Sequence, residues 1–156
     1  MAEIDNTDKR ILMALQQNAK LTTKELANKV NLSVTPVFER QKRLEKDGFI
    51  KKYVAVLDPD KIGLNMIVFC NVKLKQHSKQ NGKAFVDAIN KMDEVTECYN
   101  TSGDYDFMIK IYVKDMKDYQ NFVLNKLGEI DAIGSLHSTF IIGEIKNSQS
   151  LPLINI

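Results

Sequence analysis

Four cationic side chains between residues 40 and 46 are the group best suited to bind another molecule, and they are Arg40, Lys42, Arg43 and Lys46. A planar guanidinium group donates two parallel hydrogen bonds, which suits a phosphate or the edge of a guanine base. The chain has three arginines, Arg10, Arg40 and Arg43, and none follows residue 43. Basic residues on a helix are usually only solvated, but this concentration of arginine favours contact with nucleic acid.

Net charge differs between the two parts of the chain. Residues 1–52 hold 11 Lys and Arg against 7 Asp and Glu, whereas residues 53–156 hold 11 against 13. The composition, with 44% hydrophobic and 27% charged residues, is that of a soluble globular protein. No apolar run approaches the ~20 residues of a membrane span, and the first residues lack the apolar segment of a signal peptide. We therefore expect a cytoplasmic protein with no membrane partner.

Residues 21–48 have the pattern of two short helices joined by a tight turn. Thr22 and Glu25 have the spacing of a capping box, which predicts the start of the first helix. A turn at Asn31 follows, after which Ser33 can cap the second helix. Gly48 can supply the left-handed residue that ends the second helix. A helix pair of this length, with a basic outer face on its second member, suits the major groove of DNA.

A further helix precedes this pair, with Asp5 or Asn6 as its cap. The three helices predict a helix-turn-helix DNA-binding domain over residues 1–48. We expect its core to consist of seven apolar side chains: Ile4, Ile11, Leu15, Leu26, Val30, Val37 and Leu44. A unit of this size is only marginally stable alone, so we expect it to contact the rest of the chain or a partner subunit.

The remaining residues alternate between strand and helix patterns. Residues 49–57 predict a strand that either pairs with its twin across a dimer or connects the domains, within a linker of residues 49–64. From residue 66 the predicted order is β-α-β-β-α-β, a ferredoxin-like arrangement within residues 65–147, and residues 148–156 form a C-terminal tail. The predicted strands are 66–75, 95–101, 107–113 and 136–146, and the predicted helices are 82–91 and 115–128. Both helices would cover one face of the sheet, and the exposed apolar groups of the other face predict sheet-to-sheet dimerisation.

The turn between residues 101 and 107 contains the sequence GDYD. The simplest interpretation is a β-turn in which Gly103 provides backbone freedom. Asp104 and Asp106 could also act as an acid–base or metal-binding pair, but no histidine cluster or phosphate-binding loop accompanies them. Cys70 and Cys98 lie far apart, and we expect both to be small buried residues on strands. We therefore expect no enzyme activity, no metal site and no cofactor.

Two long motifs resemble the Lrp/AsnC (leucine-responsive regulatory protein) family of transcription regulators. They are LSVTPVFERQKRLEKDGFI at residues 32–50 and ECYNTSGDYDFMIK at residues 97–110, with shorter matches at residues 8–12, 22–27 and 139–146. The resemblance extends from residue 4 to residue 146. It implies an α+β fold, with an N-terminal three-helix (winged) helix-turn-helix and a ferredoxin-like sensing domain. It also implies a homodimer built on the sensing domains that assembles further, commonly to an octamer. One departure is Gln41, where relatives usually carry an apolar residue.

The resemblance also implies roles for particular residues. An amino-acid effector would bind at an interface between dimers, on the residues Tyr99, Gly103, Asp104, Tyr105, Asp106, Met116 and Thr139. Within this set, the GDYD turn would hold the amino and carboxylate groups of the effector. Tyr99, Met116 and Thr139 would shape the pocket for its side chain. Double-stranded DNA would bind on the residues Ser33, Thr35, Pro36, Glu39, Arg40, Lys42, Arg43 and Lys46.

Among these, Arg40 and Arg43 are the expected contacts to base edges, and Lys42 and Lys46 the expected contacts to phosphates. Glu39 can accept from cytosine or orient Arg43. The predicted function is a sequence-specific transcription regulator whose assembly responds to the effector. The alternative is an amino-acid sensor with a weak or vestigial DNA-binding half.

Overall fold

The computed structural model describes residues 4–153, which form two compact units. One unit holds the residues up to Val56 together with those from Ile145 onward, and the other is Leu57–Glu144. The chain therefore passes between the units twice, and the first unit contains both its earliest and its latest described residues.

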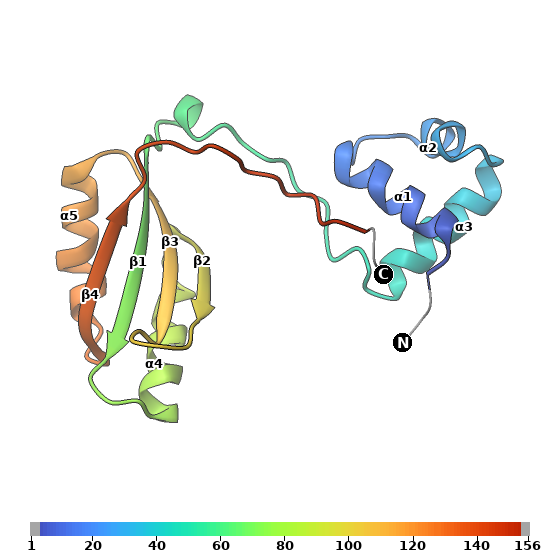
Figure 1. Cartoon of the computed structure of the whole chain (residues 1–156). Coiled ribbons are helices and arrows are strands. Elements are labelled where there is room, and N and C mark those ends of the chain that lie inside the picture. Colours follow the sequence, from blue (N-terminus) through green and yellow to red (C-terminus); the bar gives the residue numbers. More distant parts are fainter. Residues whose placement is uncertain (1–3, 154–156) are drawn as a thin grey trace. The chain divides into compact units, whose positions relative to one another are not determined.

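The first unit contains three helices, α1 (Asn6–Gln17), α2 (Thr23–Val30) and α3 (Val34–Lys46) (Figure 1). The predicted caps are confirmed at α1 and α2, where Asp5 and Thr22 each form a capping box with the residue three positions later. Ser33 is the N-cap of α3, but its side chain makes no capping hydrogen bond. Asn31 and Gly48 have left-handed φ angles of 53° and 79°, which turn the chain at the ends of α2 and α3.

The predicted core of this unit is confirmed. Six of the seven predicted side chains are at most 6% exposed, and Ile4 packs against them partly buried. Residues near the C-terminus add to this core, because Leu153 packs against the same cluster. The side-chain amide of Gln16 also donates to the carbonyl oxygen of Leu151 at 3.2 Å and accepts from its N–H at 2.6 Å. Leu151 and Leu153 of the predicted C-terminal tail therefore contribute to the helical unit.

The predicted strand at residues 49–57 is wrong for the single chain. The structure describes all of these residues, and none of them belongs to a strand. Val54, Val56 and Leu57 are 60–70% exposed although their side chains are apolar. A high β-propensity does not by itself form a strand, because the backbone groups need a neighbouring strand with which to pair.

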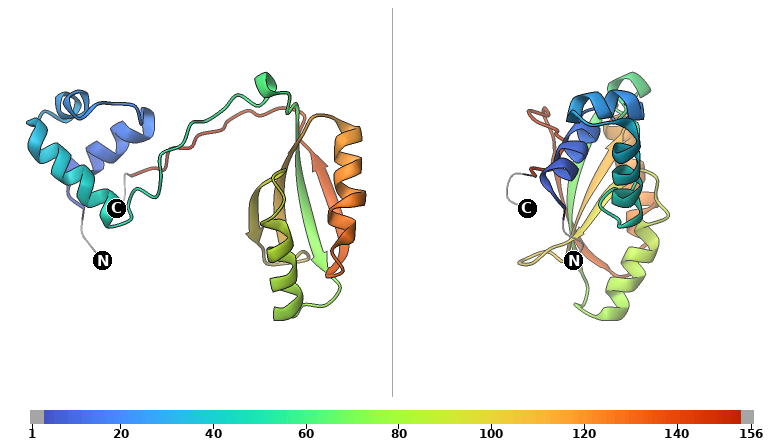
Figure 2. Two further views of the ribbon diagram at one scale, coloured as in Figure 1. Left: turned by 180° about the vertical axis from the view of Figure 1, so that it is seen from behind. Right: turned by 90° about the vertical axis from the view of Figure 1, so that its right-hand side faces the viewer.

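The second unit contains a four-stranded antiparallel sheet in the order β2-β3-β1-β4. Its strands are β1 (Met66–Leu74), β2 (Val95–Asn100), β3 (Phe107–Val113) and β4 (Ile133–Phe140). The helices α4 (Lys79–Ile89) and α5 (Met116–Asn125) connect them, and the short 3-10 helices η1 (Asp60–Ile62) and η2 (Leu127–Glu129) lie in the loops. Figure 2 (left) shows both α-helices on one face of the sheet. This is the predicted ferredoxin-like arrangement.

Two predicted positions in this unit were wrong. The helix predicted at residues 82–91 begins three residues earlier, at Lys79, and ends at Ile89. The last strand ends at Phe140 and not at residue 146, and it begins at Ile133 and not at residue 136. Its partner β1 begins at Met66, so the ladder stops after Ile141 donates to the carbonyl of Ile67. The apolar pattern of the sequence continues beyond this point, but no strand of the sheet remains to pair with it.

The two faces of the sheet have different surroundings. The helices cover the side chains of Val68, Cys70 and Val72 on β1, all of which are fully buried. The opposite face, which we call the open face, carries side chains that alternate with the buried ones along each strand. They include Ile67, Phe69, Glu97, Tyr99, Met108, Lys110, Tyr112, His137 and Thr139. Cys98 is exposed on the edge strand β2, so its predicted burial was wrong. None of the helices within residues 4–153 is both long enough and apolar enough to cross a membrane.

Candidate DNA interface and effector site

A buried carboxylate connects the second helix of the predicted pair to the first helix of the chain. Asp8 is 1% exposed, and its Oδ1 and Oδ2 accept from Arg40 Nη1 at 2.8 Å and from Arg43 Nη2 at 2.5 Å. Arg40 Nη1 also contacts Asp5 Oδ2 at 2.6 Å. Hydrogen bonds between ionised groups are stronger than neutral ones. The two arginines therefore fix the position of α3 against the N-terminus of α1.

These contacts change the interpretation of Arg40. Arg40 was expected to contact bases from the outer face of α3, but its side chain is 29% exposed and lies on the same side as the buried Val37 and Leu44. Residues at positions i, i+3 and i+7 share one face of a helix, which explains this placement. Arg43 is 49% exposed, so part of its guanidinium group still faces solvent.

The outer face of α3 is formed by other residues. Thr35, Phe38, Glu39, Lys42 and Lys46 are exposed at helical spacing. Lys42 Nζ contacts Glu45 Oε2 at 3.1 Å and lies 5.9 Å from the centre of the Phe38 ring. Phe38 is 49% exposed on this face. Ser33 is exposed at the start of the helix and Pro36 is half-buried in its first turn.

A polar cluster joins α3 to the segment that follows it. The Gln41 amide donates to Tyr53 Oη at 3.0 Å and to Glu45 Oε1 at 3.3 Å, and the Tyr53 hydroxyl donates to Glu45 Oε1 at 3.0 Å. Hydrogen bonds from Lys42, Tyr53 and Gln41 outweigh the effect of burial and hold the pKa of Glu45 below its ordinary value. Gln41, the residue that departs from the family pattern, therefore has polar partners.

The GDYD turn in the second unit connects β2 to β3, and its last residue makes the most contacts. The backbone N–H of Asp106 donates to Val72 and its carbonyl accepts from Thr101, at 2.9 and 3.0 Å. Its side-chain Oδ2 accepts from the N–H of Leu74 at 2.7 Å, and its Oδ1 lies 2.7 Å from His77 Nδ1. The Leu74 N–H and then His77 lower the pKa of Asp106. Gly103 has a φ of 108°, a conformation that L-residues rarely adopt, which explains glycine at this position.

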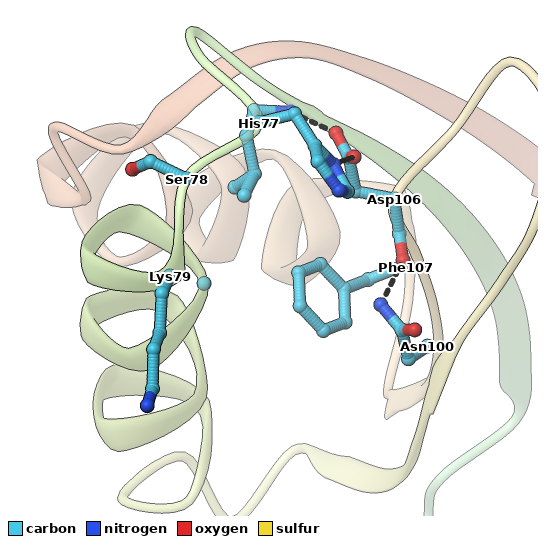
Figure 3. Close-up of a pocket in the computed structure, with 8 residues that line it drawn as sticks. His77, Ser78, Lys79, Asn100, Asp106 and Phe107 are labelled. Atoms are coloured by element: carbon cyan, nitrogen blue, oxygen red, sulfur yellow. Dashed lines mark hydrogen bonds and ion pairs between the residues drawn. The ribbon is translucent and has the colours of Figure 1, made fainter.

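A cavity of about 330 Å³ lies beside Asp106 (Figure 3). Its lining residues are Leu74, His77, Ser78, Lys79, Gly82, Asn100, Asp106 and Phe107. Ser78 caps α4, so the N-terminal end of that helix, which carries a partial positive charge, borders the cavity. The Asn100 side chain donates to the carbonyl of Asp106 at 2.9 Å, and the centre of the Phe107 ring lies 4.6 Å from that of Phe85, with the two rings tilted by 34°. The cavity thus combines a carboxylate, a helix N-terminus and an apolar wall.

The seven predicted effector residues do not all meet at this cavity. Gly103 and Asp104 are exposed in the turn, and the Tyr105 ring lies 6.1 Å from the ring of His137. Tyr99 and Thr139 lie on the open face of the sheet, away from the helices. Met116 is 52% exposed at the start of α5, beyond the opposite end of β3 from Asp106. Within one chain, only Asp106 of this set lines the cavity.

Several residues with clear contacts were not identified from the sequence. His77 belongs to no histidine cluster in the sequence, but it pairs with Asp106 across 29 positions of sequence. Lys110 is 12% exposed on the open face, 3.3 Å from Glu97 and 5.3 Å from the centre of the Tyr112 ring. Burial acts to lower the pKa of Lys110, but Tyr112 and Glu97 outweigh it and raise the pKa. These pairs form only through strand register and loop geometry, which the sequence pattern does not contain.

Comparison with known proteins agrees with both units. Residues 4–51 match the model of a winged helix-turn-helix DNA-binding domain, and residues 67–151 match the Lrp/AsnC ligand binding domain. The chain is 37% identical over 150 residues to the DNA-binding transcriptional activator DecR of Escherichia coli, covering 96% of this chain and 99% of DecR. It is 33% identical to the transcriptional regulator AzlB of Bacillus subtilis, covering 96% of each chain.

A solved structure shares the whole fold. The transcriptional regulator NMB0573 of Neisseria meningitidis, in complex with L-Met, is 34% identical and superposes with a TM-score of 0.94, covering 97% of this chain and 98% of the other. Both family models and the full-length relatives indicate a DNA-binding transcription regulator. The chain belongs to the Lrp/AsnC family of DNA-binding transcription regulators.

Proposed function

We propose that this regulator binds DNA with the outer face of α3 and responds to an amino acid bound beside Asp106. The observation that carries the DNA-binding assignment is that the two sides of α3 have different surroundings. Its inner side is fixed to α1 through Arg40, Arg43 and the buried Asp8, while Lys42 and Lys46 face outward. A helix held in one orientation keeps each exposed side chain at a fixed position relative to the base pairs, as sequence recognition requires. The relatives that it resembles are bacterial regulators, whose DNA lies in the cytoplasm, so we propose that it also functions there.

The structural contacts modify the roles assigned to the arginines. Arg40 uses its guanidinium group on Asp5 and Asp8, so we assign it to positioning α3. Arg43 is half exposed, and its remaining N–H groups are available to a phosphate or a base. Direct base contacts then fall to the outer face, where Thr35 and Glu39 are exposed beside Lys42.

The effector assignment rests on the cavity at Asp106. An α-amino acid carries an ammonium and a carboxylate group, and the cavity has complementary partners for both. The Asp106 carboxylate suits the ammonium, and the N-terminus of α4 with Lys79 suits the carboxylate. His77, whose side chain is 88% exposed, is the partner of Asp106 Oδ1 that an ammonium group would replace. The L-Met complex of the neisserial relative supports an amino acid as the effector class.

We further propose that two copies pair through the open face of the sheet, and that pairs assemble further. This face holds the partly buried side chains of Ile67, Phe69, Met108 and Tyr112 without a covering helix. Tyr99, Thr139 and Met116 lie outside the cavity of one chain, so in the effector site they would act from a neighbouring copy. Residues 49–57, which expose the apolar side chains of Val54, Val56 and Leu57, would pair with the same segment of the partner. Light scattering with and without L-Met tests the assembly.

The DNA-binding proposal is tested with the full-length protein and duplexes selected from a randomised pool. Lys42→Ala and Lys46→Ala should each reduce the slope of log affinity against log salt by about 1 for each bound subunit, because each removes one phosphate contact per subunit. Lys83→Ala on α4 is the control and should leave the slope unchanged. If no duplex is enriched and binding is independent of salt, the alternative of a sensor with a vestigial DNA-binding half is correct.

A further inference from the structure

Two apolar side chains are exposed on the helix that the proposed function assigns to DNA. Phe38 is 49% exposed and Val34 is 46% exposed. They are four positions apart on α3 and therefore adjacent on its surface. The core of the unit is formed by Val37 and Leu44 on the other side of the helix, so packing within the unit does not explain an aromatic residue here.

The surroundings of Phe38 indicate what this apolar surface contacts. Lys42 Nζ lies 5.9 Å from the centre of the Phe38 ring, and Thr35 is exposed beside Val34. A surface for a folded protein partner is depleted in lysine near its centre. Here the apolar ring lies directly beside an ammonium group, and a second lysine, Lys46, follows one turn later. An apolar group among cations matches a polyanion that also presents an apolar group.

The major groove of DNA presents one such group, the C5-methyl of thymine, and a phenyl ring is among the side chains that contact it. Val34 and Phe38 occupy the first and second turns of α3, and in helix-turn-helix domains the N-terminal residues of the recognition helix reach the bases. We propose that Phe38, supported by Val34, contacts a thymine methyl group and makes the protein selective for thymine at one position of each half-site. This inference rests on the proposed role of α3.

The methyl group can be removed without changing any hydrogen bond of the base pair. Duplexes enriched from a randomised pool by the full-length protein are resynthesised with each thymine in turn replaced by deoxyuridine, and affinity is measured by fluorescence anisotropy. At one thymine of each half-site, deoxyuridine should weaken binding about fourfold, the factor expected for one buried methyl-sized group. Phe38→Ala should bind the thymine and deoxyuridine duplexes equally.

Phe49→Ala is the matched control. Phe49 is also a partly exposed phenylalanine of the same unit, at 40%, but it lies after the end of α3. This variant should keep the preference for thymine over deoxyuridine. Far-UV circular dichroism establishes that each variant is folded, and the comparison of duplexes with the unmodified protein requires no substitution at all.

Three outcomes would contradict the inference. Equal affinity of the unmodified protein for thymine and deoxyuridine at every position excludes a methyl contact. A preference that persists in folded Phe38→Ala assigns the contact to another residue, while the DNA-binding role of α3 still stands. Absence of any enriched duplex overturns both this inference and the proposed function, and Phe38 would then belong to a protein-binding surface.

Discussion

Arg43 on α3 donates to the carboxylate of Asp8 on α1 across 2.5 Å, and that carboxylate is 1% exposed. The pair joins residues 35 positions apart in the chain. Since Arg40 contacts the other oxygen of the same carboxylate at 2.8 Å, a single buried anion determines how α3 lies against α1. The orientation of the proposed DNA-binding helix therefore depends on a residue outside the helix-turn-helix pair.

Replacing this anion should destabilise the helical unit. Asp8→Ala removes the acceptor of both arginines and the side-chain half of the α1 capping box. We expect a loss of roughly 2 kcal/mol, because hydrogen bonds to charged groups contribute about 1.5–3 kcal/mol and both arginines can be rehydrated. Urea unfolding followed by circular dichroism measures the change. Asp47→Ala, at the exposed C-cap of α3, is the control and should shift the midpoint little. Equal midpoints for the two variants would contradict a structural role for Asp8.

Acid should weaken the same unit through its helix caps. The N–H of Asp8 and then Arg40 lower the pKa of Asp5 from its ordinary 3.8, and the N–H and hydroxyl of Thr22 lower that of Glu25 from 4.5. A carboxyl group whose pKa is lower in the folded state stabilises the protein above the pKa of the unfolded chain. That stability is lost as pH falls through the folded value. We therefore expect the melting temperature to begin falling near pH 4.5 and to continue falling below pH 3.8.

A substitution identifies the contribution of Glu25. Gln can still accept from the Thr22 N–H but does not ionise. Glu25→Gln should melt lower than the unmodified protein at neutral pH and equally with it at a pH well below 4. Glu39→Gln, on the exposed outer face of α3, should melt in parallel with the unmodified protein throughout. A constant difference between Glu25→Gln and the unmodified protein at every pH would exclude ionisation of Glu25 as the cause.

The sequence predicted those features that depend on neighbouring residues. The predicted capping box joins Thr22 and Glu25, three positions apart, the predicted cap at Asp5 lies next to its helix, and the left-handed Gly48 ends the helix before it, so each was recognisable from local spacing. The alternating pattern of β3 also gave its limits, Phe107 to Val113, without error. In these cases the physical cause lies within one turn of helix or one strand.

The features that were missed depend on residues distant in the sequence. Arg40 was assigned to the outer face because its partner Asp8 is 32 positions earlier. The end of β4 was predicted too late because it is set by where β1 begins. His77 approaches Asp106 only because the loop after β1 passes the start of β3. Composition and periodicity contain no information about such pairs, so the cavity at Asp106 became apparent only from the folded chain.

Replacing the Asp106 carboxylate by an amide should show whether Asp106 binds the effector or only stabilises the turn. Asp106→Asn keeps an acceptor for the Leu74 N–H but loses the negative charge. We expect it to stay folded and to bind L-Met, the first amino acid to test, at least tenfold more weakly in calorimetry, a factor that corresponds to ~1.4 kcal/mol. His77→Ala, which removes only the exposed partner, should retain binding. If Asp106→Asn binds amino acids as the unmodified protein does, Asp106 serves only the turn.

The contact between Gln16 and Leu151 leads to a prediction for the C-terminal segment. The Gln16 amide satisfies both the N–H and the carbonyl of Leu151, and Leu153 then packs on the core of the helical unit. Gln16→Ala should lower the stability of this unit by about 1 kcal/mol and speed amide exchange at Leu151 and the end of α1. Gln17→Ala, its neighbour on α1, is the matched control and should leave exchange at Leu151 unchanged. Exchange in β1 reports the other unit and should not change in either variant, because β1 is held by β3 and β4. Unaltered exchange at Leu151 in Gln16→Ala would mean that Leu153 alone holds the segment in place.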